Sequence, residues 1–209
     1  MPFELLPLHI FEERYQVMLE DIKTEKNLFG LSYFNSQETI LEKPVSGSIG
    51  CVAEIRETHS LPEGRSNILT IGVIRYRLID FVNTTEPYFV GNVEFFEDFE
   101  EDEKLLQELS DEVFLLFRRI AEAAHKLSGQ QGEFPEIPQT QPEQLSFLVC
   151  AAFNLETELK YKMLETRSTI ERLEKLREIL KQTVDRVEDS AEIHKIAQTN
   201  GFSKKKINL

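Results

Sequence analysis

The sequence predicts an α+β protein in which a β-rich half comes first and a helical half follows. Before residue 100, short apolar runs alternate with a period of two residues and are separated by turn residues. After residue 100, apolar residues recur at helical spacing over long stretches. Strands first and helices later indicate an α+β layout, because α/β sheets need the two to alternate along the chain. We therefore expect a β-rich subdomain over 1–100, a helical bundle over 101–190 and a flexible tail over 191–209.

In the β-rich half, the apolar segment Pro7–Phe11 precedes a helix that we expect to begin at Glu12. Further strands are expected over 28–34, 40–41, 48–57, 68–81 and 88–97, and 58–67 is expected to form a hairpin tip. Within 68–81 the apolar residues change parity beside Gly72, which predicts a bulge or sharp bend there, since one extra residue exchanges the two faces of a strand. Several twisted antiparallel strands with one bend predict a small, partly closed barrel.

In the helical half, the apolar stripe Leu105–Leu127 predicts one long helix, and the Pro- and Gly-containing segment 129–141 predicts a linker. Three more helices are expected, at about 142–153, 155–165 and 168–188. Thr140 with Glu143 and Ser168 with Glu171 fit capping boxes, and Asn154 could cap the helix between them. The stripe of Leu173, Leu176 and Leu180 favours packing inside the bundle over a coiled coil between chains.

Charge and composition exclude several functional classes. The chain has 209 residues and a formal net charge of −13, which disfavours binding to nucleic acid or to an anionic membrane. No apolar run is long enough to span a bilayer, and the N-terminus has no signal-peptide pattern. Two cysteines, Cys51 and Cys150, form no disulfide framework and suit a reducing compartment. We expect a cytoplasmic protein, or a plastid stromal one if it comes from a photosynthetic eukaryote.

The sequence contains no motif that supplies catalytic, nucleotide-binding or metal-binding chemistry. It has no phosphate-binding loop, no dinucleotide fingerprint, no nucleophile elbow and no zinc-ligand spacing, so we expect neither an enzyme nor a cofactor. His9 could be a general base, but a hydrogen-bonded structural role is favoured, and Cys51 and Cys150 are expected to be buried structural thiols. The carboxylates of 94–103 fit no calcium loop and are expected to form a solvated face.

Three phenylalanines near the end of the β-rich half are candidates for contact with a partner. A strand can bury only one of two consecutive side chains on a given face, so Phe95 or Phe96 should lie outside the main core. Packing against the helical half is the simpler interpretation of Phe95, Phe96 and Phe99. The functional interpretation is an apolar contact for a protein partner. With Leu61 at the hairpin tip, these residues form the expected protein-binding set.

Several segments resemble the Lon protease amino-terminal domain. Residues 7–15 read P-L-H-I-F-E-E-R-Y, which is similar to its P-L-H-I-F-E-x-R-Y signature, and the other matching segments follow in the family's order. They are G-C-V-A-E-I at 50–55, L-P-E-G-R at 61–65, G-V-I-R-Y-R-L at 72–78, K-M-L-E at 162–165 and E-R-L-E-K-L at 171–176. The resemblance covers about 5–188. Each segment alone is weak, and their order and spacing together are specific.

The resemblance implies a β-rich pseudo-barrel, like that of RNA-binding PUA domains, followed by a helical bundle. In full Lon proteases this region recognises protein substrates and helps the hexamer to assemble, whereas the ATPase and Ser-Lys protease domains lie beyond it. The family usually has a strand ending in F-P-G before the 7–15 signature, and this chain starts almost at that point. We expect either a late start or a missing strand, which would leave a sheet edge open to a partner or a second copy.

The function we expect is a non-catalytic protein- or peptide-binding module of the stand-alone Lon-domain type. It would bind unfolded or partly folded polypeptides, or adapt them to a separate protease or chaperone, and it could form a homodimer. The alternative is a PUA-like protein that binds a small molecule or RNA, which the negative charge disfavours for RNA. A hydrolase whose groups converge only in three dimensions is the remaining possibility.

Overall fold

The computed structural model describes residues 1–24, 26–33, 43–128, 134–153 and 155–200, and it divides into two compact units. Unit 1 comprises Met1–Glu100 and Phe147–Ser168, and unit 2 comprises Glu101–Ser146 and Thr169–Leu209. One boundary between the units falls between Glu100 and Glu101. However, Phe147–Ser168, which we expected in the helical subdomain 101–190, belongs with the β-rich unit.

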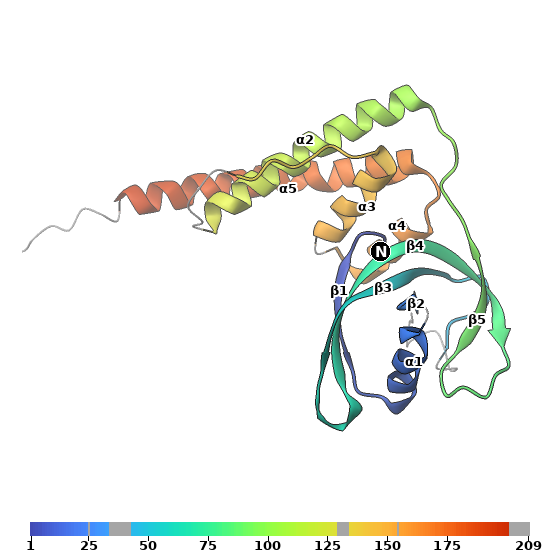
Figure 1. Ribbon diagram of the computed structural model, residues 1–209. Helices are drawn as coiled ribbons and strands as arrows, with labels where there is room; N and C mark the ends of the chain where they lie inside the picture. The colour runs from blue at the N-terminus through green and yellow to red at the C-terminus, as the bar shows by residue number, and fades with distance from the viewer. Residues whose placement is uncertain (25, 34–42, 129–133, 154, 201–209) are drawn as a thin grey trace, which may run out of the picture. The chain divides into compact units, whose positions relative to one another are not determined.

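Unit 1 is built on a five-stranded antiparallel sheet whose strands curl around one another without closing (Figure 1). Four strands follow the order β1-β4-β3-β2, and the fifth pairs with the second half of β4. The strands and the short helical elements between them are β1 (Leu5–Ile10), α1 (Glu13–Lys23), β2 (Leu28–Ser32), β3 (Ile49–Ser60), the 3-10 turn η1 (Pro62–Gly64), β4 (Ser66–Val82) and β5 (Val90–Phe95). The expected α+β class and incomplete barrel are confirmed. The strand expected at 40–41 lies outside the described residues.

The bulge predicted beside Gly72 is present. Val52 lies opposite Ile74 and Ala53 lies opposite Gly72, so Val73 is the extra residue in β4. Because one extra residue exchanges the two faces of a strand, Thr70 before the bulge and Tyr76 after it lie on opposite faces of the sheet, and both are buried. Two further register shifts occur, at Arg56 in the β3–β4 pairing and at Ile79 in the β4–β5 pairing.

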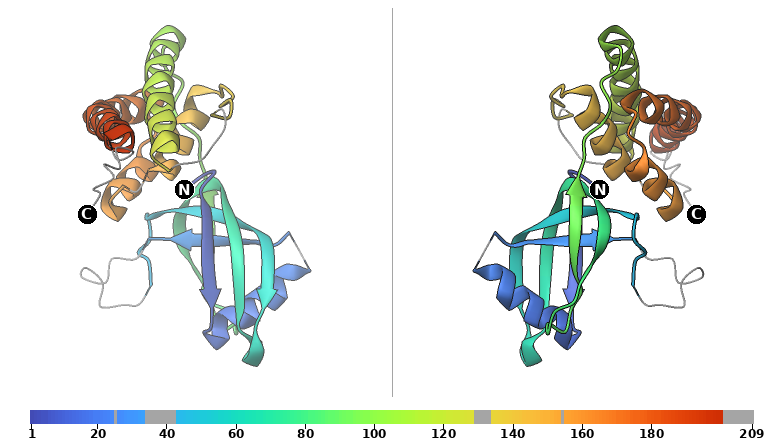
Figure 2. Two further views of the ribbon diagram at one scale, coloured as in Figure 1. Left: turned by 90° about the vertical axis from the view of Figure 1, so that its left-hand side faces the viewer. Right: turned by 90° about the vertical axis from the view of Figure 1, so that its right-hand side faces the viewer.

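Two apolar clusters form the core of unit 1. One lies beneath α1, which packs against the curved sheet (Figure 2) and buries Leu19 against Ile10 and Ile68. The other joins Ile49 and Cys51 of β3 to Leu164, which lies in α4 (Thr157–Glu165). The Ile49 N–H also donates to the Tyr161 hydroxyl at 3.2 Å. Since α4 supplies part of this core, it completes the sheet rather than the helical bundle.

Unit 2 is dominated by α2 (Glu103–Leu127) and α5 (Thr169–Asn200), which lie side by side (Figures 1 and 2). Their apolar stripes meet as expected for internal packing. The buried residues are Leu109, Val113, Leu116 and Ile120 of α2, and Leu173, Leu176, Leu180 and Val184 of α5. On the surface, Glu112 of α2 accepts from Arg177 at 3.3 Å and from Lys181 at 2.6 Å. α3 (Pro142–Ala152) runs from this unit into unit 1.

Several expected helix ends differ in the structure. Asp102 caps α2, accepting from the Leu105 N–H at 2.8 Å. The capping box expected at Thr140 does not form through that side chain, because its buried hydroxyl has no hydrogen-bond partner. α4 begins after Glu156, and Asn154 lies outside the described residues. α5 continues to Asn200 instead of ending near residue 188, so part of the expected tail 191–209 is helical.

Candidate functional site

The three candidate phenylalanines lie at the end of β5 and just beyond it. Phe95 and Phe99 are exposed, at 55% and 58%, whereas Phe96 is half-buried and packs against the Ile49–Leu164 cluster. The expectation that one of Phe95 and Phe96 lies outside the main core is confirmed. Phe89, just before β5, is exposed at 53%, and its ring lies 5.4 Å from that of Phe81. We call Phe89, Phe95 and Phe99 the aromatic strip.

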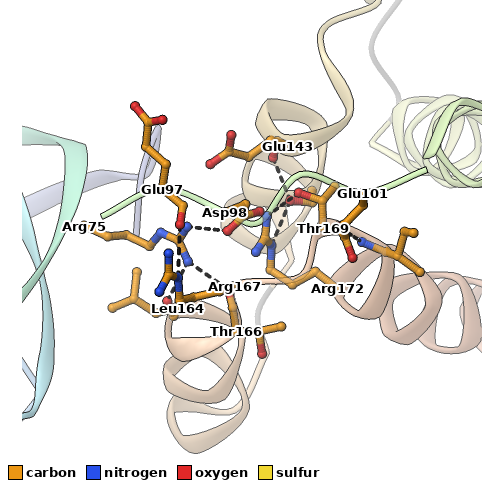
Figure 3. Close-up of polar contacts among 12 residues, drawn as sticks. Arg75, Glu97, Asp98, Glu101, Glu143, Leu164, Thr166, Arg167, Thr169 and Arg172 are labelled. Carbon is orange, nitrogen blue, oxygen red and sulfur yellow. Dashed lines mark hydrogen bonds and ion pairs between the residues drawn. The ribbon is translucent and has the colours of Figure 1, made fainter. Parts of the chain in front are cut away.

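A buried arginine holds the segment that follows β5 in place (Figure 3). The Arg75 side chain is 3% exposed and forms an ion pair with Asp98, which is 6% exposed. The other end of the guanidinium donates to the carbonyls of Leu164 at 3.1 Å and Thr166 at 2.8 Å. We call Arg75 with these three partners the arginine clamp. It satisfies the charge of Arg75 with a carboxylate and two carbonyls, as a buried guanidinium requires.

Aromatic rings enclose the guanidinium of the clamp. The Arg75 guanidinium carbon lies 4.7 Å from the centre of the Phe96 ring and 5.0 Å from that of Phe147 in α3. Both distances are within the range of cation–π attraction. Phe96 therefore has a structural role, and part of its ring is covered by the guanidinium of Arg75.

Arg167 contacts both the ring and the backbone of Phe99. Its guanidinium lies 4.3 Å from the Phe99 ring centre and 5.5 Å from that of Phe96. Its Nε donates to the Glu97 carbonyl at 3.1 Å, and the Phe99 N–H donates to the Arg167 carbonyl at 2.9 Å. These reciprocal bonds join the segment after β5 to the segment after α4. One face of the Phe99 ring is covered by Arg167, and the ring still exposes more than half of its surface.

Leu61 does not join the phenylalanines. It is half-buried at the tip of the β3–β4 hairpin, where its N–H donates to the Arg65 carbonyl at 2.8 Å. Phe95 pairs with Tyr76, ten positions beyond the start of β4, which corresponds to roughly 30 Å of extended strand. The four residues expected to bind a partner are thus divided between the hairpin tip and the β5 end of the sheet.

The other candidate residues have structural surroundings. His9 Nδ1 lies 2.7 Å from Asn67 Oδ1, and Cys51 and Cys150 are both buried free thiols. Burial raises the pKa of the Cys51 thiol, which disfavours the reactive thiolate. Among the residues that the structure describes, no cluster of His, Cys, Asp and Glu could hold a metal ion. No helix in the described ranges is long and apolar enough to cross a membrane.

A second buried arginine, in unit 2, escaped the sequence analysis. Arg172 is completely buried in α5, where Nε donates to the Ser146 hydroxyl and Nη2 donates to the Thr169 hydroxyl, both at 3.0 Å. The Glu101 carboxylate accepts from the Ile170 N–H at 3.0 Å (Figure 3). The sequence offered one sign that Arg172 is buried: it directly precedes Leu173, a residue of the apolar stripe of α5.

Carboxylates surround the aromatic strip. The segment 86–103 contains eight Asp and Glu residues and no Lys or Arg. Glu94, Glu97 and Glu100 are exposed, and their carboxylates form no ion pair within the described part of the chain. Apolar rings bordered by free carboxylates form a surface that suits a ligand with both apolar and cationic groups. This surface offers contacts and contains no nucleophile beside a base.

An open antiparallel sheet completed by helices is typical of α+β domains with a PUA-like sheet. Two solved structures share the fold. The N-terminal domain of the Mycobacterium avium complex Lon protease is 17% identical, with a TM-score of 0.60 that covers 87% of this chain and 91% of that chain. A Lon N-terminal domain protein from Xanthomonas campestris is also 17% identical, with a TM-score of 0.54 over 84% of this chain and 89% of that chain.

The chain belongs to the family of the ATP-dependent protease La (LON) substrate-binding domain, whose family model matches residues 1–182. The similarity inferred from the short segments of 5–188 is thereby confirmed. The match extends through the sheet, α2, α3 and α4 and into the first half of α5.

Full-length Lon proteases contain this domain as a small part of their length. The Lon protease of Dictyoglomus thermophilum is 28% identical over 184 residues, which is 84% of this chain and 22% of that protein. The Lon protease of Leptospira interrogans serogroup Icterohaemorrhagiae serovar copenhageni is 25% identical over 195 residues, 92% of this chain and 23% of that protein. The chain thus spans less than a quarter of the length of these relatives.

Proposed function

We propose that this protein binds extended or partly unfolded polypeptides without cutting them and delivers them to a separate protease or chaperone. The observation that carries the proposal is the match of residues 1–182 to a substrate-binding domain. The aromatic strip supports it, since large exposed rings are the side chains that most often anchor a protein partner. Two buried free thiols suit a reducing compartment, and we propose that the protein acts in the cytoplasm, or in the plastid stroma if it comes from a photosynthetic eukaryote.

Binding of a permanently unfolded polypeptide tests the first half of this function. A reduced, alkylated protein carrying a fluorophore should bind the full chain with a Kd in the micromolar range, roughly −7 to −8 kcal/mol, measured by anisotropy. Absence of binding at a chain concentration of about 100 μM would contradict the proposal.

Matched variants locate the surface that is used. Phe95→Ala removes a ring that is 55% exposed, and we expect it to weaken binding roughly fivefold, or about 1 kcal/mol. Leu115→Ala removes a side chain that is 57% exposed on α2 in unit 2, and binding should stay unchanged. Equal effects of the two variants would mean that the aromatic strip is not the binding surface.

Delivery to a second protein is tested in native lysate. Crosslinking followed by mass spectrometry should enrich one ATP-dependent protease or chaperone with the full chain, and this enrichment should survive substitution of Phe95 by Ala. Recovery of only a broad set of misfolded proteins would support binding and contradict the delivery step.

A further inference from the structure

The free edge of β5 is the feature from which a more specific ligand can be inferred. β5 pairs with β4 on one side, and within the described residues no strand pairs with its other side. Every residue from Gly91 to Phe95 is exposed. Such an edge presents a row of backbone N–H and C=O groups that an extended polypeptide can extend as a further strand.

The two faces of β5 have different chemistry. Side chains of a strand alternate between faces, so Val93 and Phe95 point to one face and Glu94 to the other. Val93 and Phe95 are 39% and 55% exposed, and they lie opposite Leu78 and Tyr76 of β4. Glu94 is exposed and lies opposite Arg77 in the register, without an ion pair between them in the described structure. One face of the strand therefore presents the apolar side chains of Val93 and Phe95, and the other presents the carboxylate of Glu94.

The chain segment that contains the edge is acidic. The segment 86–103, which contains β5, has eight carboxylates and no cationic side chain, and Glu97 and Glu100 beyond the strand are exposed. A strand that paired with β5 would place alternate residues against Val93 and Phe95 and the intervening residue against Glu94. Opposite charges paired across strands are stabilising, as are apolar pairs, and like charges are destabilising.

We propose that the β5 edge binds an extended polypeptide segment in which large apolar residues alternate with Lys or Arg. This inference rests on the proposed function and specifies the kind of polypeptide that is held. The backbone of the segment pairs with Val90–Phe95, its apolar side chains cover Val93 and Phe95, and its cationic side chains face Glu94. Recognition thus depends on a period of two residues as well as on composition.

Peptides of matched composition test the period. An octapeptide that alternates Val or Phe with Lys should bind the full chain roughly tenfold more tightly than a peptide with the same residues in one apolar and one basic block. An alternating peptide with Glu in place of Lys should bind more weakly than either. N-methylation of alternate amides in one of the two possible registers should abolish binding, since it removes the donors that face β5. Equal affinity for the alternating and block peptides would overturn the inference.

Charge-reversal variants test the site. Glu94→Lys should reverse the preference, so that the alternating Glu peptide binds better than the alternating Lys peptide. Glu174→Lys makes the same charge change at an exposed position of α5 and should leave the preference as it is. On binding, amide exchange should slow within 90–95 and not within α2 or α5. An unchanged preference in Glu94→Lys, or protection outside β5, would overturn the inference.

The outcome also separates this inference from the function on which it rests. If unfolded proteins bind but alternating and block peptides do not differ, the polypeptide-binding function stands and the β5 site is wrong. If neither unfolded proteins nor any peptide binds, the function itself is wrong.

Discussion

Arg75 is a buried residue of β4 that joins segments far apart in the chain. Its partners are Asp98, which lies 23 positions away, and the carbonyls of Leu164 and Thr166, which lie 89 and 91 positions away. Removing one member of a buried ion pair is costly because the remaining charge has neither water nor a counter-charge. The segment after β5 and the segment after α4 are therefore held together by one side chain of β4.

Replacement of Asp98 tests this role. Asp98→Asn keeps the shape of the side chain and removes its charge, and we expect the free energy of unfolding to fall by about 3 kcal/mol, measured by urea denaturation. Glu100→Gln makes the same chemical change at an exposed carboxylate and should shift stability by less than about 0.5 kcal/mol. Similar losses in the two variants would show that the clamp does not carry this stability.

Ionisation of the buried Tyr76 hydroxyl should make the free energy of unfolding depend on pH in the alkaline range. Burial raises the pKa of its hydroxyl above the ordinary value of 10.0, although the hydrogen bond with Ser32 acts in the opposite direction. The folded state thus favours the neutral phenol more than the unfolded state does. That contribution is complete below pH 10.0 and is lost as the pH rises through the folded pKa. The pKa values of Cys51 and Tyr161 are raised as well, also mainly by burial.

Tyr76→Phe should therefore flatten the alkaline decline. In the unmodified chain we expect the free energy of unfolding to fall from about pH 9 upward, as determined by urea denaturation at a series of pH values. In the variant this fall should be shallower, and at pH 7 the variant should differ only by the lost hydrogen bond to Ser32, about 1 kcal/mol. An unchanged alkaline slope would mean that Tyr76 is not the group that titrates.

At the scale of elements, a glycine in β2 and a glycine in β3 leave space for the Tyr76 ring of β4. A Cβ on Gly50 of β3 would lie 2.2 Å from Tyr76 Cζ and 2.7 Å from the Leu31 carbonyl oxygen. A Cβ on Gly30 of β2 would come no closer than 2.9 Å, to the Tyr76 hydroxyl oxygen. The two glycines make room for one aromatic ring, and the space at Gly50 is the tighter because backbone bounds it.

Alanine at these two positions should reveal that difference. We expect Gly50→Ala to destabilise the protein by about 3 kcal/mol and Gly30→Ala by about 1 kcal/mol, as measured by thermal unfolding. In a Tyr76→Phe background the cost of Gly30→Ala should shrink, since the nearest atom is gone, whereas that of Gly50→Ala should persist. The reverse order would contradict the packing at Tyr76.

Local patterns in the sequence predicted where strands and helices lie better than they predicted which residues contact one another in the folded chain. The change of parity beside Gly72 was sufficient to predict the bulge, because a slip of one residue is visible in the alternation itself. Arg75 could not be recognised as buried, since a charged residue in a strand is ordinarily solvated and its partners are distant in sequence. The sequence also left open whether Phe96 is buried, because the residues that cover it are distant in sequence. Only the structure shows the ring against Arg75.

At the scale of the whole molecule, the sequence did not predict which unit α4 completes. Its helical spacing resembles that of its neighbours, so we expected it in the bundle. The side chains that decide the matter are Tyr161, which accepts from Ile49, and Leu164, which packs on Cys51. Lys160 adds an ion pair with Glu4 at 2.7 Å. Tertiary partners of this kind leave no periodic signal in a single sequence.

Unit 1 should therefore fold from two separate segments. A variant in which a flexible linker replaces 101–146 and the chain ends at residue 168 should unfold cooperatively, as measured by calorimetry. A fragment of residues 1–100 should unfold at lower temperature or without a cooperative transition, since Ile49 and Cys51 lose the cover of α4. Equal cooperativity of the two would contradict the assignment of α4 to this unit.

The discontinuity of unit 1 also sets an order of events on the ribosome. All five strands leave the exit tunnel before α4 is translated, since the sheet ends at Phe95 and α4 begins at Thr157. At about 5–20 residues per second, the intervening segment and α4 take roughly 4–14 seconds to synthesise. During that interval the nascent sheet carries an uncovered apolar surface at Ile49 and Cys51, where a chaperone of the nascent chain can bind before α4 arrives.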